Sequence, residues 1–175
     1  MIKAFANLMS SKATLLFLVL GLCSVSFAAP AASTVPAQKE PRKSTVHWMS
    51  YKDALEKAQK GPKLIFVDLY ADWCVPCRIM DANVYSDPTV ASLLNTRFYA
   101  VKLDADSQDT IMCDGQKNTV QRCYFDVWEL HALPAFVLVA PKGMSILTVT
   151  DSMSPQELRY MLYQFLEKEK EWISR

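Results

Sequence analysis

The sequence has very few histidines and no large excess of charge of either sign, and both shortages exclude classes of function. Its only histidines are His47 and His131, and 19 lysines and arginines are nearly balanced by 18 aspartates and glutamates. A zinc site built on a cysteine pair needs a second pair at matching spacing or suitably placed histidines. Cys113 and Cys123 have nine residues between them, which does not fit. We therefore expect no metal ion, and the near-neutral charge gives no reason to expect nucleic acid as a partner.

The chain is also too short for two domains of ordinary size, and it contains no internal repeat. Its 175 residues, 51% of them hydrophobic, suit one domain with a single core. Residues 29–45 consist mainly of Ala, Pro, Ser, Lys and Gln and cannot bury enough apolar surface to order themselves. We predict a flexible linker over residues 29–45, followed by one folded domain over residues 46–175.

The N-terminus has the features of a signal peptide. Two lysines precede an uncharged apolar run over residues 13–22, and Ser26 and Ala28 have the small side chains and the spacing that signal peptidase requires. We predict that residues 1–28 are a signal peptide and that the protein is exported to the periplasm. Their removal takes away two lysines and no acidic residue, which leaves 17 basic against 18 acidic residues.

Two other interpretations of the N-terminus stay open. The apolar stretch can be extended to Ala29 and then approaches the roughly 17 residues that cross a bilayer, as an uncleaved anchor would. Cys23 suggests a lipoprotein, although Leu22 stands where a lipobox has a small residue. With residues 1–28 removed, four cysteines remain in the exported part, where cysteine pairs persist as disulfides.

Apolar patterning and capping signals predict a mixed α/β fold. We expect helices over residues 51–60, from the cysteine motif to about 85, 87–94, 117–129 and 154–172, and strands over residues 64–70, 97–103, 135–139 and 146–149. The first three strands are expected inside the sheet. Strand–helix–strand connections give a parallel pair, and the last two strands form an antiparallel hairpin. The predicted architecture is a three-layer α/β/α sandwich with a mixed central sheet.

Cys74 and Cys77 form a Cys-x-x-Cys motif between the first predicted strand and the next helix. Unpaired backbone N–H groups and the helix dipole at this position are expected to stabilise a thiolate at Cys74. Cys77 lies one helical turn away and can attack the same sulfur. The pair is therefore suited to thiol–disulfide exchange, with Cys74 as nucleophile and Cys77 as resolving cysteine.

The sequence around the motif resembles thioredoxin. Residues 67–77 read Val-Asp-Leu-Tyr-Ala-Asp-Trp-Cys-Val-Pro-Cys, with Ser-Asp-Pro at 86–88 and Leu-Pro at 133–134 as further matches. Over roughly residues 50–172 the chain is most similar to the C-terminal periplasmic domain of the interchange protein DsbD. Small exported reductases such as the chlamydial DsbH share the signal peptide and the single domain. The resemblance implies a thioredoxin-like fold.

The resemblance also implies roles for residues outside the cysteine pair. Pro134 would be the cis proline that faces the active-site disulfide, and Leu133 would offer its backbone to substrate chains. Trp73 would cover the active site and help dock substrates, next to Val75 and Pro76 of the motif. For Asp72, a functional role and a solvated loop acid are equally open, and Tyr70 is expected to serve packing.

Asp68 matches the buried acid that lies behind the resolving cysteine in thioredoxins. Burial within an apolar strand raises the pKa of a carboxyl group, so Asp68 could exchange a proton with Cys77. The alternative is an acid that reaches the strand end and is solvated there.

Cys113 and Cys123 have no counterpart in the family pattern. They could form a structural disulfide, worth about 2–3 kcal/mol in the chain-entropy model. They could instead exchange electrons with Cys74 and Cys77 or with an upstream donor, or remain two free buried thiols. The helical spacing of Cys123 with Val120 and Val127 favours burial over reactivity.

Together these observations predict a monomeric, exported oxidoreductase that reduces protein disulfides without a metal or organic cofactor. Its expected partners are proteins with disulfides or thiols and a membrane-bound or soluble electron donor. Two alternatives are a dedicated reductant for cytochrome c maturation and a redox-inactive thioredoxin-fold binding or chaperone module. Retention of both Cys74 and Cys77 argues against the latter.

Overall fold

The protein is described here from a computed structural model that covers residues 45–173. The predicted signal peptide and all but the last residue of the predicted linker lie outside the described residues. Between residues 45 and 173, no helix combines the length and the apolar character needed to span a membrane.

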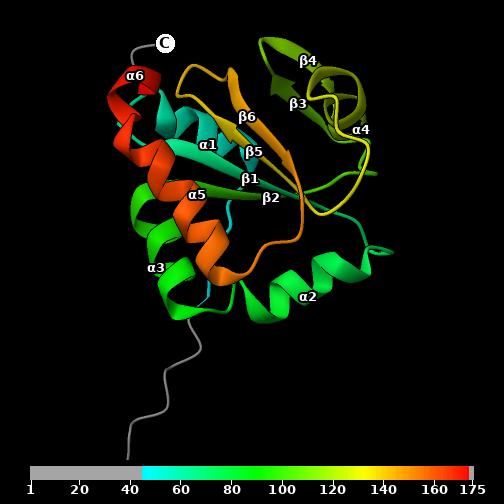
Figure 1. The fold of residues 1–175 in the computed structure, drawn as a ribbon. Coiled ribbons are helices and arrows are strands. Elements are labelled where there is room, and N and C mark those ends of the chain that lie inside the picture. The colour runs from blue at the N-terminus through cyan, green and yellow to red at the C-terminus, as the bar shows by residue number, and fades with distance from the viewer. Residues whose placement is uncertain (1–44, 174–175) are drawn as a thin grey trace, which may run out of the picture. The chain divides into compact units, whose positions relative to one another are not determined.

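A four-stranded mixed sheet forms the centre of the described part (Figure 1). Its strand order is β2 (Phe98–Asp104), β1 (Leu64–Tyr70), β5 (Ala135–Val139) and β6 (Ser145–Thr150). As predicted, β1 pairs parallel with β2, and β5 pairs antiparallel with β6. β5 also pairs antiparallel with β1, which makes the sheet mixed.

One expectation about the sheet is wrong, because β2 is an edge strand and not an inner one. Among the described residues, the outer side of β2 meets only an isolated parallel bridge between Met49 and Val101. A strand with fewer neighbours can still be buried when side chains cover its faces, and Phe98, Ala100 and Val101 are all buried. Burial alone therefore did not distinguish an edge strand from an inner one.

The two faces of the sheet carry separate core clusters, and β1 supplies both. Leu64 and Phe66 belong to the cluster under α2 (Val75–Asn83), α3 (Pro88–Arg97) and α5 (Pro155–Glu167). Ile65, Val67 and Leu69 belong to the opposite cluster, which includes α1 (Tyr51–Ala58). Side chains alternate between the faces of a strand, so Asp68 points to the same side as Phe66. The three-layer α/β/α sandwich is confirmed.

Capping groups set the starts of the longer helices where the sequence indicated. Ser50 accepts a hydrogen bond from the Asp53 N–H at the start of α1, and Ser154 forms a full capping box with Glu157 at the start of α5. The C-terminal helix is interrupted, however. It breaks at Lys168 and continues as α6 (Glu169–Ile173), so the single helix expected over residues 154–172 is two.

The predicted helix over residues 117–129 is wrong in its first part. β3 (Thr110–Cys113) and β4 (Gln116–Thr119) form an antiparallel hairpin, followed by a short α4 (Val120–Arg122) and a π-helical turn η1 (Cys123–Val127). The hairpin turn is Asp114-Gly115, with φ angles of 45° and 78°. Asp-Gly is a preferred pair for a two-residue hairpin turn because both residues tolerate positive φ. The helical spacing holds only from Val120 onward.

Candidate active site

The cysteine motif lies where β1 ends and α2 begins. Cys74 is the N-cap of α2, and its sulfur accepts a hydrogen bond of 3.2 Å from the Cys77 N–H. Cys74 and Cys77 are joined by a disulfide, with their Cα atoms 5.3 Å apart. Both residues are buried, at 2% and 4% exposure. A thiolate formed at Cys74 on reduction would thus have a backbone donor already aimed at it.

The loop before β5 packs against this disulfide through Leu133. The Leu133–Pro134 peptide bond is cis, in agreement with the thioredoxin resemblance. Leu133 is half-buried and packs against the small cluster formed by Ala71, Cys74 and Cys77. Leu133 and the two cysteines, 56 to 59 positions apart in the sequence, therefore meet at one end of the sheet.

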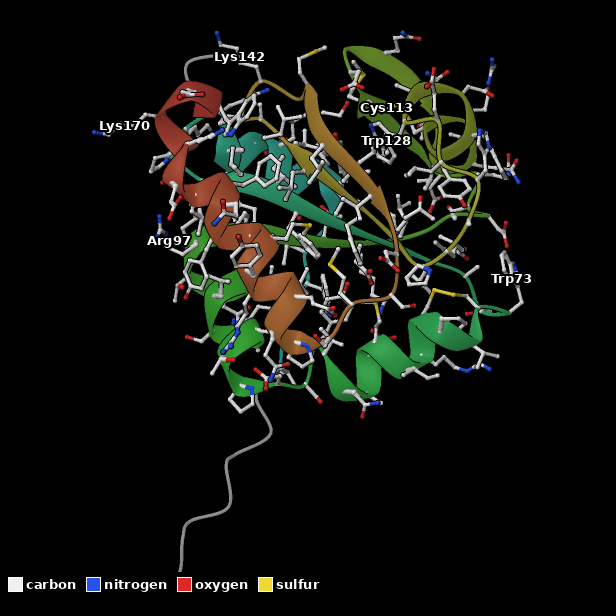
Figure 2. All side chains as sticks on the ribbon, in the orientation of Figure 1. Trp73, Arg97, Cys113, Trp128, Lys142 and Lys170 are labelled. Carbon is white, nitrogen blue, oxygen red and sulfur yellow. A yellow bond between two sulfur atoms is a disulfide. The ribbon has the colours of Figure 1, made fainter. Side chains whose placement is uncertain are left out.

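The side chains around the buried disulfide are mostly exposed and apolar. Trp73 is 66% exposed and Val75 55% exposed, and Pro76 is also exposed. Figure 2 shows Trp73 at the periphery of the molecule, beyond the start of α2. Its indole N–H donates a hydrogen bond of 2.8 Å to the Asp106 carboxylate. Exposed Asp72 contributes its backbone carbonyl, which accepts from the Arg78 guanidinium at 2.6 Å.

An apolar groove of about 380 Å³ begins at Pro76 and runs along α2 to the loop before α5. Ile79, which is 55% exposed, and Met153 lie along it. Sequence reasoning missed both residues. Ile79 follows Cys77 on the exposed side of an amphipathic helix, where an isoleucine is unusual enough to be noticed, but nothing local connects it with Met153.

Asp68 is buried, so the alternative of a solvated strand-end acid is wrong. It is 3% exposed, and its Oδ1 accepts a hydrogen bond of 2.7 Å from the Tyr85 hydroxyl. The Lys102 Nζ lies 3.5 Å from Oδ2. Burial raises the pKa of Asp68 to about 6, against the smaller lowering effects of Lys102 and the Tyr85 hydrogen bond. The carboxyl group can therefore gain and lose a proton near neutral pH.

Lys102 has a second carboxylate partner and three aromatic neighbours. Its Nζ also forms an ion pair with Asp81, which is partly exposed on α2. The rings of Trp48, Tyr70 and Tyr85 lie 5.5, 4.9 and 5.6 Å from the same nitrogen. Tyr70 thus contributes a ring to this cluster as well as packing. Sequence reasoning missed Lys102, although it stands directly beside Asp68 in the parallel register of β1 and β2.

Cys113 and Cys123 are joined by a second disulfide, between the end of β3 and the start of η1. Both residues have 0% exposure and belong to the core cluster under α1. Neither sulfur is accessible to another protein in this conformation. The structure does not contain the two free thiols that the sequence left open.

The two histidines lie outside the disulfide site. His47 is exposed ahead of α1, and exposed His131 stacks against Phe125 with ring centroids 6.1 Å apart. Between residues 45 and 173, no three His, Cys, Asp or Glu side chains gather in a way that could hold a metal ion.

Comparison with known proteins gives the family. Residues 31–168 match the family model Thioredox_DsbH, described as a protein of unknown function, DUF255. The chain belongs to this family. It is thus a member of a thioredoxin-like group whose relatives are thiol:disulfide oxidoreductases.

Two relatives and two solved structures illustrate the similarity. The thiol:disulfide interchange proteins DsbD 1 and DsbD 2 of Pseudomonas aeruginosa are 31% and 29% identical over 90 residues, 51% of this chain. A thioredoxin from Thermus thermophilus is 25% identical with a TM-score of 0.58, over 71% of this chain and 90% of that one. A DsbH oxidoreductase structure, 16% identical with a TM-score of 0.56, covers 74% of this chain and 91% of that one and shows the same fold.

The likeness to DsbD is limited to one part of that protein. The aligned segment spans 14% of the length of either Pseudomonas aeruginosa relative. What the rest of DsbD does is therefore not carried over to this chain.

Proposed function

We propose that the protein is an exported thiol–disulfide oxidoreductase that reduces disulfides in other proteins. The observation that carries this proposal is the Cys74–Cys77 disulfide at the start of α2, with the Cys74 sulfur already accepting a backbone N–H. Cis Pro134 at the loop above it and buried Asp68 on the adjoining strand complete the arrangement. Export is supported by the pattern of residues 1–28, and the periplasm is the proposed compartment.

In the proposed reaction, the Cys74 thiolate attacks one sulfur of a substrate disulfide and releases the other as a thiolate. The mixed disulfide is then attacked by Cys77, which releases the second substrate sulfur. The substrate gains two electrons and two protons, and Cys74 and Cys77 become a disulfide. A membrane-bound or soluble donor must then reduce this pair for the next cycle.

Asp68 is the proposed acceptor of the Cys77 proton. A thiol with an ordinary pKa is mostly protonated at pH 7, and only the thiolate attacks. Since the pKa of Asp68 is about 6, its carboxylate is mostly ionised at pH 7 yet basic enough to receive a proton. In the proposed reaction this proton transfer needs neither a metal nor an organic cofactor.

The proposed substrate surface combines the exposed apolar residues around the disulfide. Trp73, Val75 and Pro76 flank the cysteines, and Leu133 offers its backbone from the opposite loop. The groove along α2 extends this surface to Ile79 and Met153. An extended, cysteine-containing polypeptide could bury apolar side chains here while its disulfide meets Cys74.

The direction of electron flow is tested by equilibrating the Cys74–Cys77 couple with glutathione. A reductant should have a potential near that of thioredoxin, about −270 mV, whereas a value near the roughly −120 mV of a strong oxidant would overturn the proposed direction.

The chemistry is tested with cysteine variants. Cys77→Ser should trap substrates as mixed disulfides on Cys74, and Cys74→Ser should abolish reduction of a model protein disulfide such as that of insulin. A Cys113→Ala/Cys123→Ala double variant controls for the loss of cysteines as such. Undiminished function of Cys74→Ser would instead support a redox-inactive binding module.

A further inference from the structure

The carboxylate of Asp68 has a separate partner at each oxygen. The Tyr85 hydroxyl donates to Oδ1 at 2.7 Å, and the Lys102 ammonium lies 3.5 Å from Oδ2. Tyr85 is 4% exposed and Asp68 is 3% exposed, so water does not compete for these positions. Two donors on two oxygens fix the plane of the carboxylate, which a single partner would leave free to rotate.

The Tyr85 ring is held in place by the core. It packs edge-on against Trp48 at 5.1 Å and against Phe66 at 6.4 Å between ring centroids. Tyr85 follows α2, and its backbone N–H donates to the Met80 carbonyl at 3.0 Å. The Tyr85 hydroxyl thus reaches Asp68 from the turn that follows α2, the helix that carries the cysteine pair.

The Lys102 side chain is also held in place, by contacts with aromatic rings and a second carboxylate. Three aromatic rings lie around its ammonium group, and Asp81 forms a second ion pair with it. Cation–π contacts attract an ammonium group to the faces of aromatic rings. The Lys102 ammonium group is therefore held in place beside Asp68.

We propose that Tyr85 is a positioning residue for the resolving step: together with caged Lys102, its hydroxyl holds the Asp68 carboxylate ionised and oriented to receive the proton of Cys77. This inference rests on the proposed function, in which Asp68 accepts that proton. The new element is Tyr85, which keeps Asp68 in the ionised state that can accept the Cys77 proton.

The step that depends on Tyr85 can be written in full. The Cys77 thiol transfers its proton to Asp68, and the resulting thiolate attacks the Cys74 sulfur of the mixed disulfide. The Cys74–Cys77 bond forms as the bond between Cys74 and the substrate sulfur breaks. The substrate leaves as a thiolate that takes a proton from water, and Asp68 later returns its proton to solvent.

Opposing effects set the pKa of Asp68, and the Tyr85 hydrogen bond is one of those that lower it. Burial favours the protonated acid, and the charge of Asp81 on α2 acts in the same direction. Lys102 on β2 and the Tyr85 hydroxyl oppose it by stabilising the carboxylate. Without the Tyr85 hydrogen bond, the balance moves toward an acid that is already protonated near neutral pH and cannot accept a second proton.

The test is the pH dependence of the resolving step, followed with 5,5′-dithiobis(2-nitrobenzoate). Reduced protein attacks this reagent through Cys74 and releases one coloured thiolate; resolution by Cys77 then releases the second. The rate of the second release, measured from pH 5 to 9, reports the step directly. Tyr85→Phe should move its midpoint about one unit to higher pH and slow it about tenfold below the midpoint.

The chain offers a matched control and a variant of opposite sign. Tyr51 is also buried, at 3% exposure, but its hydroxyl has no hydrogen-bond partner among the described residues. Tyr51→Phe should leave the profile unchanged. Asp81→Asn, at a partly exposed position, should move the midpoint to lower pH because it removes a negative charge near Asp68.

The outcomes separate this inference from the proposed function. If Asp68→Asn leaves the profile unchanged, Asp68 is not the proton acceptor and the proposed role of that residue fails. If Asp68→Asn alters the profile while Tyr85→Phe behaves like Tyr51→Phe, only the role of Tyr85 is overturned. An Asp81→Asn midpoint at unchanged or higher pH also contradicts the proposed balance of charges, even if Tyr85→Phe does not fold.

Discussion

The indole N–H of Trp73 donates a hydrogen bond to the carboxylate of Asp106, 33 residues further along the chain. The exposed aromatic ring beside the cysteine pair is thereby attached to the segment that follows β2. That segment leads directly into the β3–β4 hairpin and the second disulfide. The orientation of the ring thus depends on the segment after β2, which is distant from Trp73 in the sequence.

Removing the acceptor of this hydrogen bond should weaken substrate docking. In Asp106→Ala the ring of Trp73 loses its fixed orientation, and we expect KM for a protein disulfide substrate to rise about three- to tenfold. Asp106→Asn keeps an acceptor oxygen and should stay close to the unaltered protein. Steady-state insulin reduction measures both, with Asp109→Ala as a control for loss of an exposed carboxylate nearby. Equal KM values for the two Asp106 variants would contradict the role of the bond.

The groove along α2 is expected to contribute to the binding of protein substrates but not to the reactivity of the cysteine pair. Ile79→Gln should raise KM for a protein substrate about fivefold, because a half-buried aliphatic contact is worth about 1 kcal/mol. The rate of attack on a small disulfide reagent should not change. Tyr160→Gln, at an exposed position on α5, is the control for loss of exposed apolar surface. A matching loss of rate with the small reagent would show that Ile79 acts on the cysteines instead.

The raised pKa of Asp68 predicts how stability depends on pH. The folded protein holds this proton more tightly than the unfolded chain, since the pKa is about 6 against an ordinary 3.8. The stabilising contribution is complete below the unfolded value and is lost as pH rises through about 6, at a cost of about 2–3 kcal/mol. Asp68→Asn cannot ionise and should gain this amount over the unaltered protein between pH 4 and pH 7.

Urea unfolding at the two pH values measures this difference. Asp109→Asn, an exposed aspartate, serves as the control for the change of net charge. If Asp68→Asn differs from the unaltered protein by the same free energy at both pH values, Asp68 does not titrate in this range.

The second disulfide is expected to stabilise the fold without taking part in exchange. Cys113→Ala/Cys123→Ala should lower the free energy of unfolding by about 2–3 kcal/mol, because the disulfide closes a loop with a sequence separation of 10. The potential of the Cys74–Cys77 couple should be unaffected. Alkylation under a mild reductant should label Cys74 and Cys77 but leave the fully buried pair intact. Labelling of all four at the same potential would favour electron exchange between the pairs.

Local signals were enough to predict the part of the fold that carries the cysteines. The apolar run at residues 64–70 is a strand, and Cys74 lies at the following helix start as expected. The cis Leu133–Pro134 bond was expected only because of the thioredoxin resemblance, since a proline by itself rarely indicates a cis bond. These features depend on neighbours in sequence or on a known pattern.

The errors arose where tertiary contacts decide the structure. The helix predicted over residues 117–129 has apolar residues at helical spacing only from Val120 onward. Residues 116–119 instead pair with β3, because Asp114-Gly115 forms a hairpin turn. That dipeptide was a usable signal and was overlooked. The partners of Asp68 could not be inferred in the same way. Tyr85 and Lys102 lie 17 and 34 residues away, and only the sheet register and the end of α2 bring them together.

The segment before α1 lies against β2, the edge strand of the sheet. The Met49 N–H donates to the Ala100 carbonyl at 2.9 Å, and Asn95 of α3 binds the backbone of Thr45 and His47 on either side of buried Val46. This short length of chain therefore lies along β2 and occupies a backbone acceptor that a foreign strand would use. This covering makes β2 a poor template for pairing with an unpaired strand of another polypeptide.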